Sequence, residues 1–301
     1  MLKNLSPHLQ AVLQALFVTF LWSTSWVLIK IGLQDIPALP FAGLRYTLAF
    51  LSLLPFALRR DRLSSLRRLP PGVWFRLVLL GLLFYAVTQG AQFLSLFYLP
   101  AVTVNLLLGF TPIIVAALGL ALLGEPPTLV QWGGTGLYVV GVLVYFQLDL
   151  APAGQTVGLI VAAVAVLANA LSSVLGRHVN RAQELEPTTV TLLSMGIGAI
   201  VLLVVGALIQ GLPRLSPTNW AIIVWLAVVN SALAFTLWNH TLRTLSAMES
   251  SLINNTMLIQ IPILAVVFLG ERLTWREVGG LALAAAGILI VQLSRRNHVE
   301  R

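Results

Sequence analysis

The chain is divided into apolar runs of about 20 residues, and short breaks between these runs hold most of its charged residues. A helix of that length crosses the hydrocarbon core of a bilayer, which is roughly 30 Å thick. Hydrophobic residues occupy 58% of the 301 positions and charged residues only 9%, whereas a soluble domain is about one-quarter charged. The sequence therefore predicts an all-α membrane protein.

The hydropathy pattern places ten membrane-spanning helices along the chain. Their expected ranges are 10–33, 39–58, 73–97, 101–123, 128–147, 155–179, 188–209, 218–243, 246–269 and 275–294. The first run lacks a clear small-x-small cleavage site and precedes further spans. It is therefore expected to be a retained helix and not a signal peptide.

Positive charge is distributed unevenly between the two sides of this predicted topology. With the N-terminus inside, most of the 18 Lys and Arg residues fall on the cytoplasmic side, including the cluster from Arg59 to Arg76. The positive-inside rule then predicts a multi-pass protein of a bacterial cytoplasmic (inner) membrane, with both termini cytoplasmic. The same bias explains the net charge of +8, so no nucleic-acid partner is expected.

The two halves of the chain are similar to each other. Segment 99–141 aligns with segment 245–287 without a gap, and a Gly-Glu-x-x-Thr spacing recurs at the same place in both. The predicted repeats are residues 1–150 and 151–301, with five spans each. Because five is an odd number, equivalent helices should cross the membrane in opposite directions. Inverted repeats of this kind are common in secondary transporters, whose substrate site lies between the repeats.

The residues of this repeat carry a resemblance to a known family. The run Trp22–Lys30 resembles the Trp-Gly-Ser-x-Phe-x-x-x-Lys signature that opens EamA domains of the drug/metabolite transporter superfamily, with Ser23 in place of the glycine. Segments 40–46, 101–145 and 245–293 are similar to later helices of the family. The resemblance implies ten helices in two inverted repeats around a central cavity, and export or exchange of metabolites such as amino acids. The layout also resembles that of the YddG-type amino-acid exporters.

Polar and aromatic side chains inside the apolar runs are candidates for substrate binding, because a polar group in hydrocarbon needs a partner or a wet cavity. Helical spacing places several of them on common faces of the spans. The predicted substrate-binding residues are Trp22, Ser25, Trp26, Tyr85, Gln89, Asn105, Asn169, Ser172, Trp238, Asn239 and Asn254. Neutral amides, hydroxyls and rings suit a zwitterionic or amphipathic solute. The alternative is that part of this set only joins helices by hydrogen bonds.

Two prolines lie inside the fourth and ninth expected spans. Pro112 and Pro262 each lack the N–H that a helix interior uses, so they are predicted to interrupt these helices and to act as gates.

Charged residues within or next to spans are few. Lys30 and Arg45 are interpreted either as snorkelling anchors or as a basic entrance for carboxylates. Glu271 follows a glycine at the end of a span and is expected to begin the next turn. No Asp or Glu occupies the middle of a span, which favours a facilitator or exchanger over an ion-coupled carrier.

The predicted function is secondary transport: export or exchange of small metabolites, in particular amino acids, by alternating access. An exporter of amphipathic or cationic drugs is the alternative, and an intramembrane enzyme or a structural membrane protein is more remote. The chain contains no Gly-x-Ser-x-Gly or His-Glu-x-x-His motif and no cysteine, so no enzymatic centre, cofactor or metal is expected. The expected partners are the small-molecule substrate and the lipid bilayer, and the sequence specifies no oligomeric state.

Overall fold

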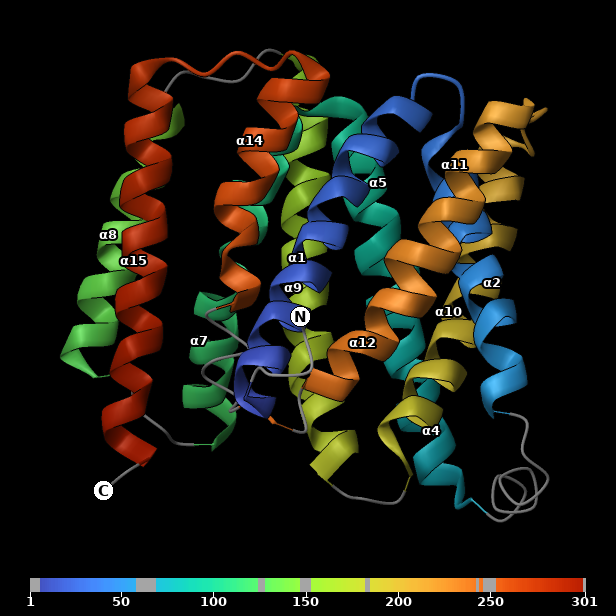
Figure 1. Ribbon diagram of the computed structural model, residues 1–301, viewed down its shortest axis with the longest axis horizontal. Coiled ribbons are helices and arrows are strands. Elements are labelled where there is room, and N and C mark those ends of the chain that lie inside the picture. The colour runs from blue at the N-terminus through green and yellow to red at the C-terminus, as the bar shows by residue number, and fades with distance from the viewer. Residues whose placement is uncertain are drawn as a thin grey trace. The chain divides into compact units, whose positions relative to one another are not determined.

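The computed structural model of the protein describes residues 6–57, 69–123, 128–146, 153–181, 185–241, 244–245 and 253–299. Every regular element within these ranges is a helix (Figure 1). The elements up to residue 123 are α1 (Pro7–Gly32), α2 (Ala38–Ala57), α4 (Pro71–Leu80), η2 (Gly81–Thr88), α5 (Gln89–Tyr98), α6 (Ala101–Leu108) and α7 (Thr111–Leu123). The later elements are α8 (Leu129–Phe146), α9 (Ala153–Arg181), α10 (Pro187–Gln210), α11 (Pro217–Ala227), η3 (Val228–Leu233), α12 (Ala234–Thr241), α14 (Met257–Leu269) and α15 (Trp275–Val299).

Seven helical stretches of the described residues are long and apolar enough to cross a membrane. They are Pro7–Gly32, Ala38–Pro55, Pro71–Tyr98, Leu129–Phe146, Gln155–Gly176, Thr188–Gln210 and Pro217–Trp238. Two shorter apolar segments, Ala101–Val115 and Ile253–Leu269, fall in the expected fourth and ninth spans. The all-α membrane class is therefore confirmed for the described residues, while the count of ten spans stays a prediction.

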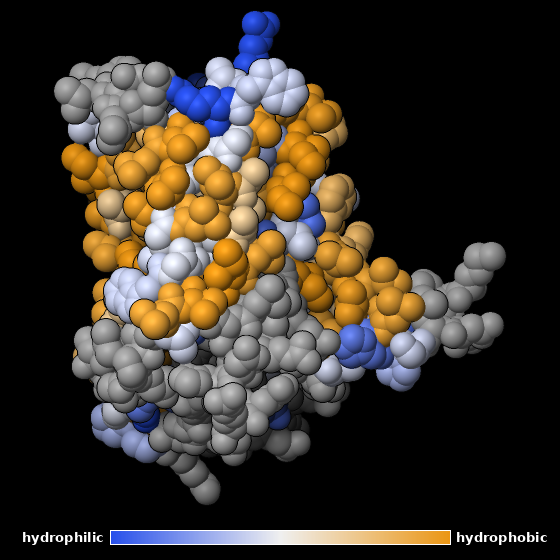
Figure 2. All heavy atoms as spheres, turned by 90° about the vertical axis from the view of Figure 1, so that its left-hand side faces the viewer, coloured by the Kyte–Doolittle hydropathy of each residue, from blue (hydrophilic) through white to orange (hydrophobic). Residues whose placement is uncertain are grey.

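Apolar side chains cover the outer faces of the helices. On α8 and α15, Leu129, Trp132 and Trp275 are among the large hydrophobic residues that are exposed. Figure 2 shows a broad area of hydrophobic atoms with hydrophilic side chains gathered above it. Contiguous exposed apolar surface is what a helix presents to lipid.

The chain forms two compact units. The first consists of Met1–Leu28, Pro100–Ala153 and Leu233–Arg301, and the second of Ile29–Leu99 and Gly154–Ala232. Each unit combines segments of both predicted repeats. The repeat boundaries 1–150 and 151–301 therefore differ from the unit boundaries and stay a prediction.

In the first unit, α8 and α15 lie side by side (Figure 1). A Cβ atom on Gly141 would lie 2.6 Å from the carbonyl oxygen of Gly280, and one on Gly134 would lie 2.8 Å from that of Gly287. Glycine at these positions lets the two backbones approach closely. The order of the contacts makes the helices antiparallel. The alignment of the two halves pairs Gly134 with Gly280 and Gly141 with Gly287. The contact of Gly134 with Gly287 is therefore equivalent to the contact of Gly280 with Gly141.

The same two helices begin in the same way. At the start of α8, Gln131 N–H donates to Thr128 Oγ1 at 3.2 Å and Thr128 N–H donates to Gln131 Oε1 at 2.9 Å. At the start of α15, Glu277 N–H donates to Thr274 Oγ1 at 3.3 Å and Thr274 N–H donates to Glu277 Oε2 at 2.7 Å. These are two capping boxes, and they occupy equivalent positions in the alignment of the halves.

In the second unit, glycines bring α2 against α10. A Cβ atom on Gly43 would lie 2.5 Å from Leu203 Cα, and one on Gly206 would lie 2.7 Å from the backbone nitrogen of Pro40. A buried apolar cluster joins α4, α9 and α10; its members are Val73, Leu77, Leu80, Val179 and Val190.

Two of the expected spans contain π-helical segments. η2 continues α4, and η3 continues α11. The wider turn is visible in hydroxyl bonds to the fifth preceding carbonyl, from Thr88 to Leu83 and from Ser231 to Leu226. The two segments lie in the third and eighth expected spans, which are equivalent helices of the two predicted repeats. Short π-helical segments inside α-helices often occur at functional sites.

Two further expected spans are interrupted. The fourth breaks at Gly109–Phe110 between α6 and α7, so Pro112 is the second residue of α7, where its missing N–H is not needed. The ninth breaks at Thr256, and Pro262 lies inside α14 without ending it. Both expected spans are therefore interrupted shortly before their prolines and not at them, and the role of Pro112 and Pro262 as gates stays a prediction.

Candidate functional site

An aromatic cluster in the first unit joins α1 to α12. The ring of Trp22 lies 5.2 Å from that of Trp238 and 5.4 Å from that of Phe235, with tilted interplanar angles of 50° and 55°. Sequence reasoning placed Trp22 and Trp238 in the site, and the structure brings these two together. Phe235 is the third ring. Tilted rings offer apolar edges and electron-rich faces, which suit apolar groups and organic cations.

A polar network occupies another face of α1. Ser23 Oγ donates to Gln260 Oε1 at 2.8 Å, and Gln260 Nε2 donates to Thr256 Oγ1 at 2.9 Å and to Thr19 Oγ1 at 3.3 Å. Thr256 lies at the break before α14. The site prediction missed these residues. The signal was present, because Ser23 departs from the glycine of the family signature, and Thr19 and Ser23, like Thr256 and Gln260, are one helical turn apart.

Two predicted site residues on α1 are buried. Ser25 Oγ donates to the carbonyl of Trp22 at 2.6 Å, one turn earlier in the helix. The side chain of Trp26 is 6% exposed. The Ser25 hydroxyl therefore has its hydrogen-bond acceptor within α1 itself.

The predicted asparagines of the first unit have different surroundings. Asn105 is buried in α6, and its Nδ2 donates to the carbonyl of Met257 at the start of α14, at 3.4 Å. Asn254 is exposed and lies just before the break at Thr256. The side chain of Asn239 lies outside the described residues. Asn105 therefore ties α6 to α14.

In the second unit, Tyr85 and Gln89 lie in one cluster with Tyr46. The Tyr46 hydroxyl donates to Gln89 Oε1 at 2.6 Å, and the rings of Tyr46 and Tyr85 are 5.5 Å apart at 66°. Tyr85 belongs to η2, and Gln89 is the first residue of α5, directly after the end of η2. Tyr46 was not predicted, although it directly follows a charged residue within an apolar run.

Arg45 is buried beside this cluster, with 5% of its surface exposed. Its Nε donates to Ser231 Oγ in η3 at 3.1 Å, and its Cζ lies 5.1 Å from the ring centroid of Tyr46 and 6.0 Å from that of Phe93. A snorkelling side chain would place its charged end in water. The anchor interpretation is therefore wrong for Arg45.

Lys30 makes different contacts. Its Nζ donates to the carbonyls of Leu96 and Leu99 at 2.6 and 2.8 Å, at the end of α5. Carbonyls at a helix C-terminus lack intrahelical partners and carry partial negative charge, so an ammonium group stabilises them. Lys30 thus caps a helix of its own unit.

The remaining predicted residues of the second unit lie on α9. Ser172 is buried and donates to the carbonyl of Asn169 at 2.9 Å. This bond, like that of Ser25, lies within one helix. The structure places these two residues together, and this bond alone does not indicate a ligand-binding role.

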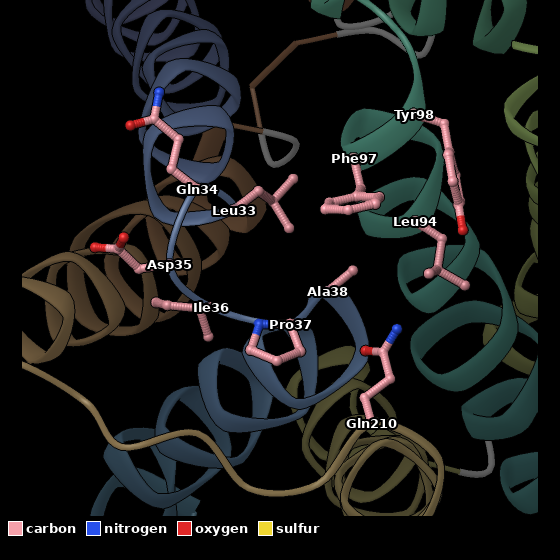
Figure 3. A pocket seen from close by; sticks show the side chains of 10 residues that line it. All are labelled: Leu33, Gln34, Asp35, Ile36, Pro37, Ala38, Leu94, Phe97, Tyr98 and Gln210. Atoms are coloured by element: carbon pink, nitrogen blue, oxygen red, sulfur yellow. The ribbon is translucent and has the colours of Figure 1, made fainter. Parts of the chain in front are cut away.

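A pocket of about 450 Å³ opens in the second unit (Figure 3). Its lining residues are Leu33, Gln34, Asp35, Ile36, Pro37, Ala38, Leu94, Phe97, Tyr98 and Gln210. Leu33 and Phe97 point toward one another, while Gln34 and Asp35 point away from the centre. None of the predicted site residues lines this pocket, and its interior is mostly apolar.

The chemistry of these clusters is that of binding. Among the described residues, no group of three or more His, Asp or Glu side chains could hold a metal ion. The clusters contain rings, amides, hydroxyls and one guanidinium within apolar helices. Polar groups of this kind inside membrane-crossing helices are typical of polytopic transport proteins.

Comparison with known proteins identifies the class. The model of the EamA-like transporter family matches residues 9–147 and again residues 156–293. The chain belongs to the EamA-like transporter family and is a transmembrane transporter.

Curated relatives agree with this assignment. Protein PecM of Dickeya dadantii is 29% identical over 78% of this chain and 80% of its own length. The "Probable amino-acid metabolite efflux pump" of Salmonella typhimurium is 25% identical over 92% of each chain. The "Uncharacterized inner membrane transporter YedA" of Escherichia coli (strain K12) is 25% identical over 92% of this chain and 87% of its own.

A solved structure has the same fold. One protein crystal structure matches with a TM-score of 0.65 and 22% sequence identity, covering 95% of this chain and 99% of the other.

Proposed function

We propose that this transporter exports or exchanges amino acids or similar small metabolites across a bacterial inner membrane. The observation that carries the proposal is the contact of Trp22 with Trp238, at 5.2 Å between ring centroids. It joins residues of the first and the eighth expected spans, in segments that are otherwise mostly apolar. The relatives from Salmonella typhimurium and Escherichia coli named as probable amino-acid metabolite efflux pumps support the same substrate class.

The proposed architecture is ten helices in two inverted five-helix repeats, with alternating access to a central site. The antiparallel contacts between α8 and α15 support inverted repeats. The two helices are the equivalent last spans of the two predicted repeats, and they run in opposite directions. The capping boxes, the π-helical segments and the helix breaks each recur in equivalent spans of the two halves, which adds to this support. The interruptions before Pro112 and Pro262 are the proposed gates, because interrupted helices bend at low cost.

Each unit contains residues that are proposed to bind the substrate. In the first unit, Trp22, Phe235 and Trp238 are proposed to contact the apolar part of a solute. In the second unit, Tyr85 and Gln89 are proposed to contact polar groups. Ser25, Trp26, Asn105, Asn169, Ser172, Asn239 and Asn254 remain proposed substrate-binding residues.

Transport by purified protein tests the proposal. Proteoliposomes preloaded with unlabelled amino acids should take up the matching labelled amino acid faster than protein-free liposomes do. Trp238→Ala should slow this counterflow, whereas Trp132→Ala, at a ring that is 58% exposed on α8, should not. If no member of a panel of the common amino acids moves faster than through protein-free liposomes, the amino-acid proposal fails.

Export of organic cations is a second candidate, because the tilted rings of Trp22, Phe235 and Trp238 also suit a cation. Tetraphenylphosphonium uptake in the same proteoliposomes separates the candidates. Uptake of this cation without amino-acid counterflow would favour drug export.

The absence of cysteine allows a clean test of topology. Single cysteines introduced as Gly72→Cys and Arg214→Cys, both at exposed positions, should react with an impermeant maleimide from opposite sides. With the termini cytoplasmic, position 214 should react in intact cells and position 72 only after lysis. The reverse pattern would overturn the proposed orientation.

A further inference from the structure

Among the described residues, Arg45 is the one charged side chain that is buried. It lies in the first half of α2, and Ser231, Tyr46 and Phe93 contact its guanidinium group within the second unit. Burial of a charge in a membrane-crossing helix is costly and is usually retained for a function.

The surroundings of this guanidinium compensate its charge only in part. An arginine side chain has five N–H donors and no acceptor. Within the described part of the chain, its one hydrogen bond is that of Nε to Ser231 Oγ, and no carboxylate lies within ion-pair distance. The rings of Tyr46 and Phe93 stabilise the cation through their faces but accept no conventional hydrogen bond from it. The two terminal amino groups form a fork that matches the two oxygens of a carboxylate.

Neutral polar groups lie on the neighbouring elements. Tyr46, next to Arg45 in the chain, donates to Gln89 and packs against Tyr85. Tyr85 lies in η2 and Ser231 in η3, so Arg45 and Tyr46 contact both π-helical segments. Such segments supply irregular backbone where function requires it.

Lys30 provides the internal contrast. Its ammonium group donates to two carbonyls at the end of α5, so its charge stabilises the C-terminus of that helix. Arg45 has no such helix terminus and no anionic partner among the described residues. Of the two cations that the sequence singled out, only Arg45 combines deep burial with unused donors.

We infer that Arg45 binds the carboxylate of the transported solute. The inference rests on the proposed function and names the group that the protein recognises: a carboxylate, as in amino acids, held by the guanidinium fork beside the Tyr46, Tyr85 and Gln89 cluster. With Arg45 only 5% exposed, a solute reaches it when the surrounding helices move apart, as alternating access requires.

Three probes that share a phenyl ring separate the charges. Phenylalanine carries a carboxylate and an ammonium group, phenylacetate only the carboxylate, and phenethylamine only the ammonium group. Binding is measured by the thermal unfolding of purified protein in detergent over a concentration series of each probe. Phenylalanine and phenylacetate should stabilise the wild-type protein. In Arg45→Gln the apparent affinity for these two should fall by about tenfold or more, as expected for loss of a charged hydrogen bond, with phenethylamine unchanged.

Two control variants sharpen the comparison. Arg214→Gln removes an exposed positive charge from the same unit and should leave all three affinities unchanged. Arg45→Lys keeps the charge without the fork, so it should retain folding and still lose affinity for the two carboxylates. It therefore decides the matter if Arg45→Gln does not fold.

Equal affinity of Arg45→Gln and wild type for phenylacetate would overturn the inference. So would an equal loss for all three probes, which indicates a structural tie to Ser231. Failure of both carboxylates to stabilise the wild-type protein at millimolar concentration would overturn it as well. Binding of the carboxylates without counterflow in proteoliposomes would support the carboxylate site and contradict the proposed export. Undiminished counterflow in Arg45→Gln would support export and contradict the carboxylate site.

Discussion

Glu271 and Ala101 link the end of α14 to the start of α6. Glu271 Oε1 accepts the backbone N–H of Ala101 at 2.7 Å, and its Oε2 accepts that of Val102 at 3.2 Å. α6 begins directly after Pro100, and no side chain of its own caps it. The carboxylate therefore supplies both the acceptors and the negative charge that a helix N-terminus favours. Gly270, at a φ of 67°, turns the chain so that Glu271 follows the helix end.

Glu271→Ala should lower the free energy of unfolding by about 1–2 kcal/mol, as the loss of a helix cap does. Unfolding in mixed detergent micelles, followed by circular dichroism, measures this. Arg272→Gln changes the exposed neighbouring residue and should have little effect. Equal stability of Glu271→Ala and wild type would show that the cap contributes nothing.

Gly141→Ala should destabilise the contact of α8 with α15. The added Cβ would lie 2.5 Å from the backbone nitrogen of Ala284, which cannot move without shifting α15. The expected cost is about 1–3 kcal/mol, the range for overpacking. Gly133→Ala on the same helix meets no atom within 4 Å and should leave stability unchanged or slightly raised. Equal unfolding free energies for the two variants would contradict the close contact.

Trp238→Ala should raise the KM for the transported solute, and Trp238→Phe should raise it less, because the phenyl ring keeps part of the contact with Trp22. Aromatic pairs contribute about 0.5–1.5 kcal/mol beyond their buried area, which corresponds to roughly two- to tenfold in KM. Initial rates of counterflow over a substrate series measure KM. A KM that is the same in all three proteins would exclude the cluster from binding.

Lys30→Met should lower stability without changing the preference between phenylalanine and phenethylamine. Its Nζ bonds to the Leu96 and Leu99 carbonyls are charge-assisted, and loss of a bond of this type costs about 1.5–3 kcal/mol. Thermal unfolding with each probe measures both quantities in one experiment. A selective loss of phenylalanine binding would instead revive the hypothesis that Lys30 forms a basic entrance.

Local patterns predicted the helical class of the described residues and the position of most of the longer helices. Apolar runs indicated the class of fold because hydropathy sums over about 20 neighbouring residues and needs no knowledge of the rest of the chain. The alignment of Thr128 with Thr274 falls on the two capping boxes, since a cap is made by residues close together in the chain. The aromatic pair of Trp22 and Trp238 was also chosen from spacing within single helices.

The sequence by itself determined that this chain is a helical membrane protein with a repeated pattern. Only the tertiary structure decided which polar groups meet: Glu271 with Ala101, Ser23 with Gln260, and Arg45 with Ser231, far apart in the chain. It also decided that two spans contain π-helical segments and that two break before their prolines. The physical reason is that lipid solvates all apolar surfaces about equally well. Hydropathy therefore determines which segments form membrane helices but not how a helix is rotated or where it bends. Rotation and bending follow from close packing and hydrogen bonds between helices far apart in the chain.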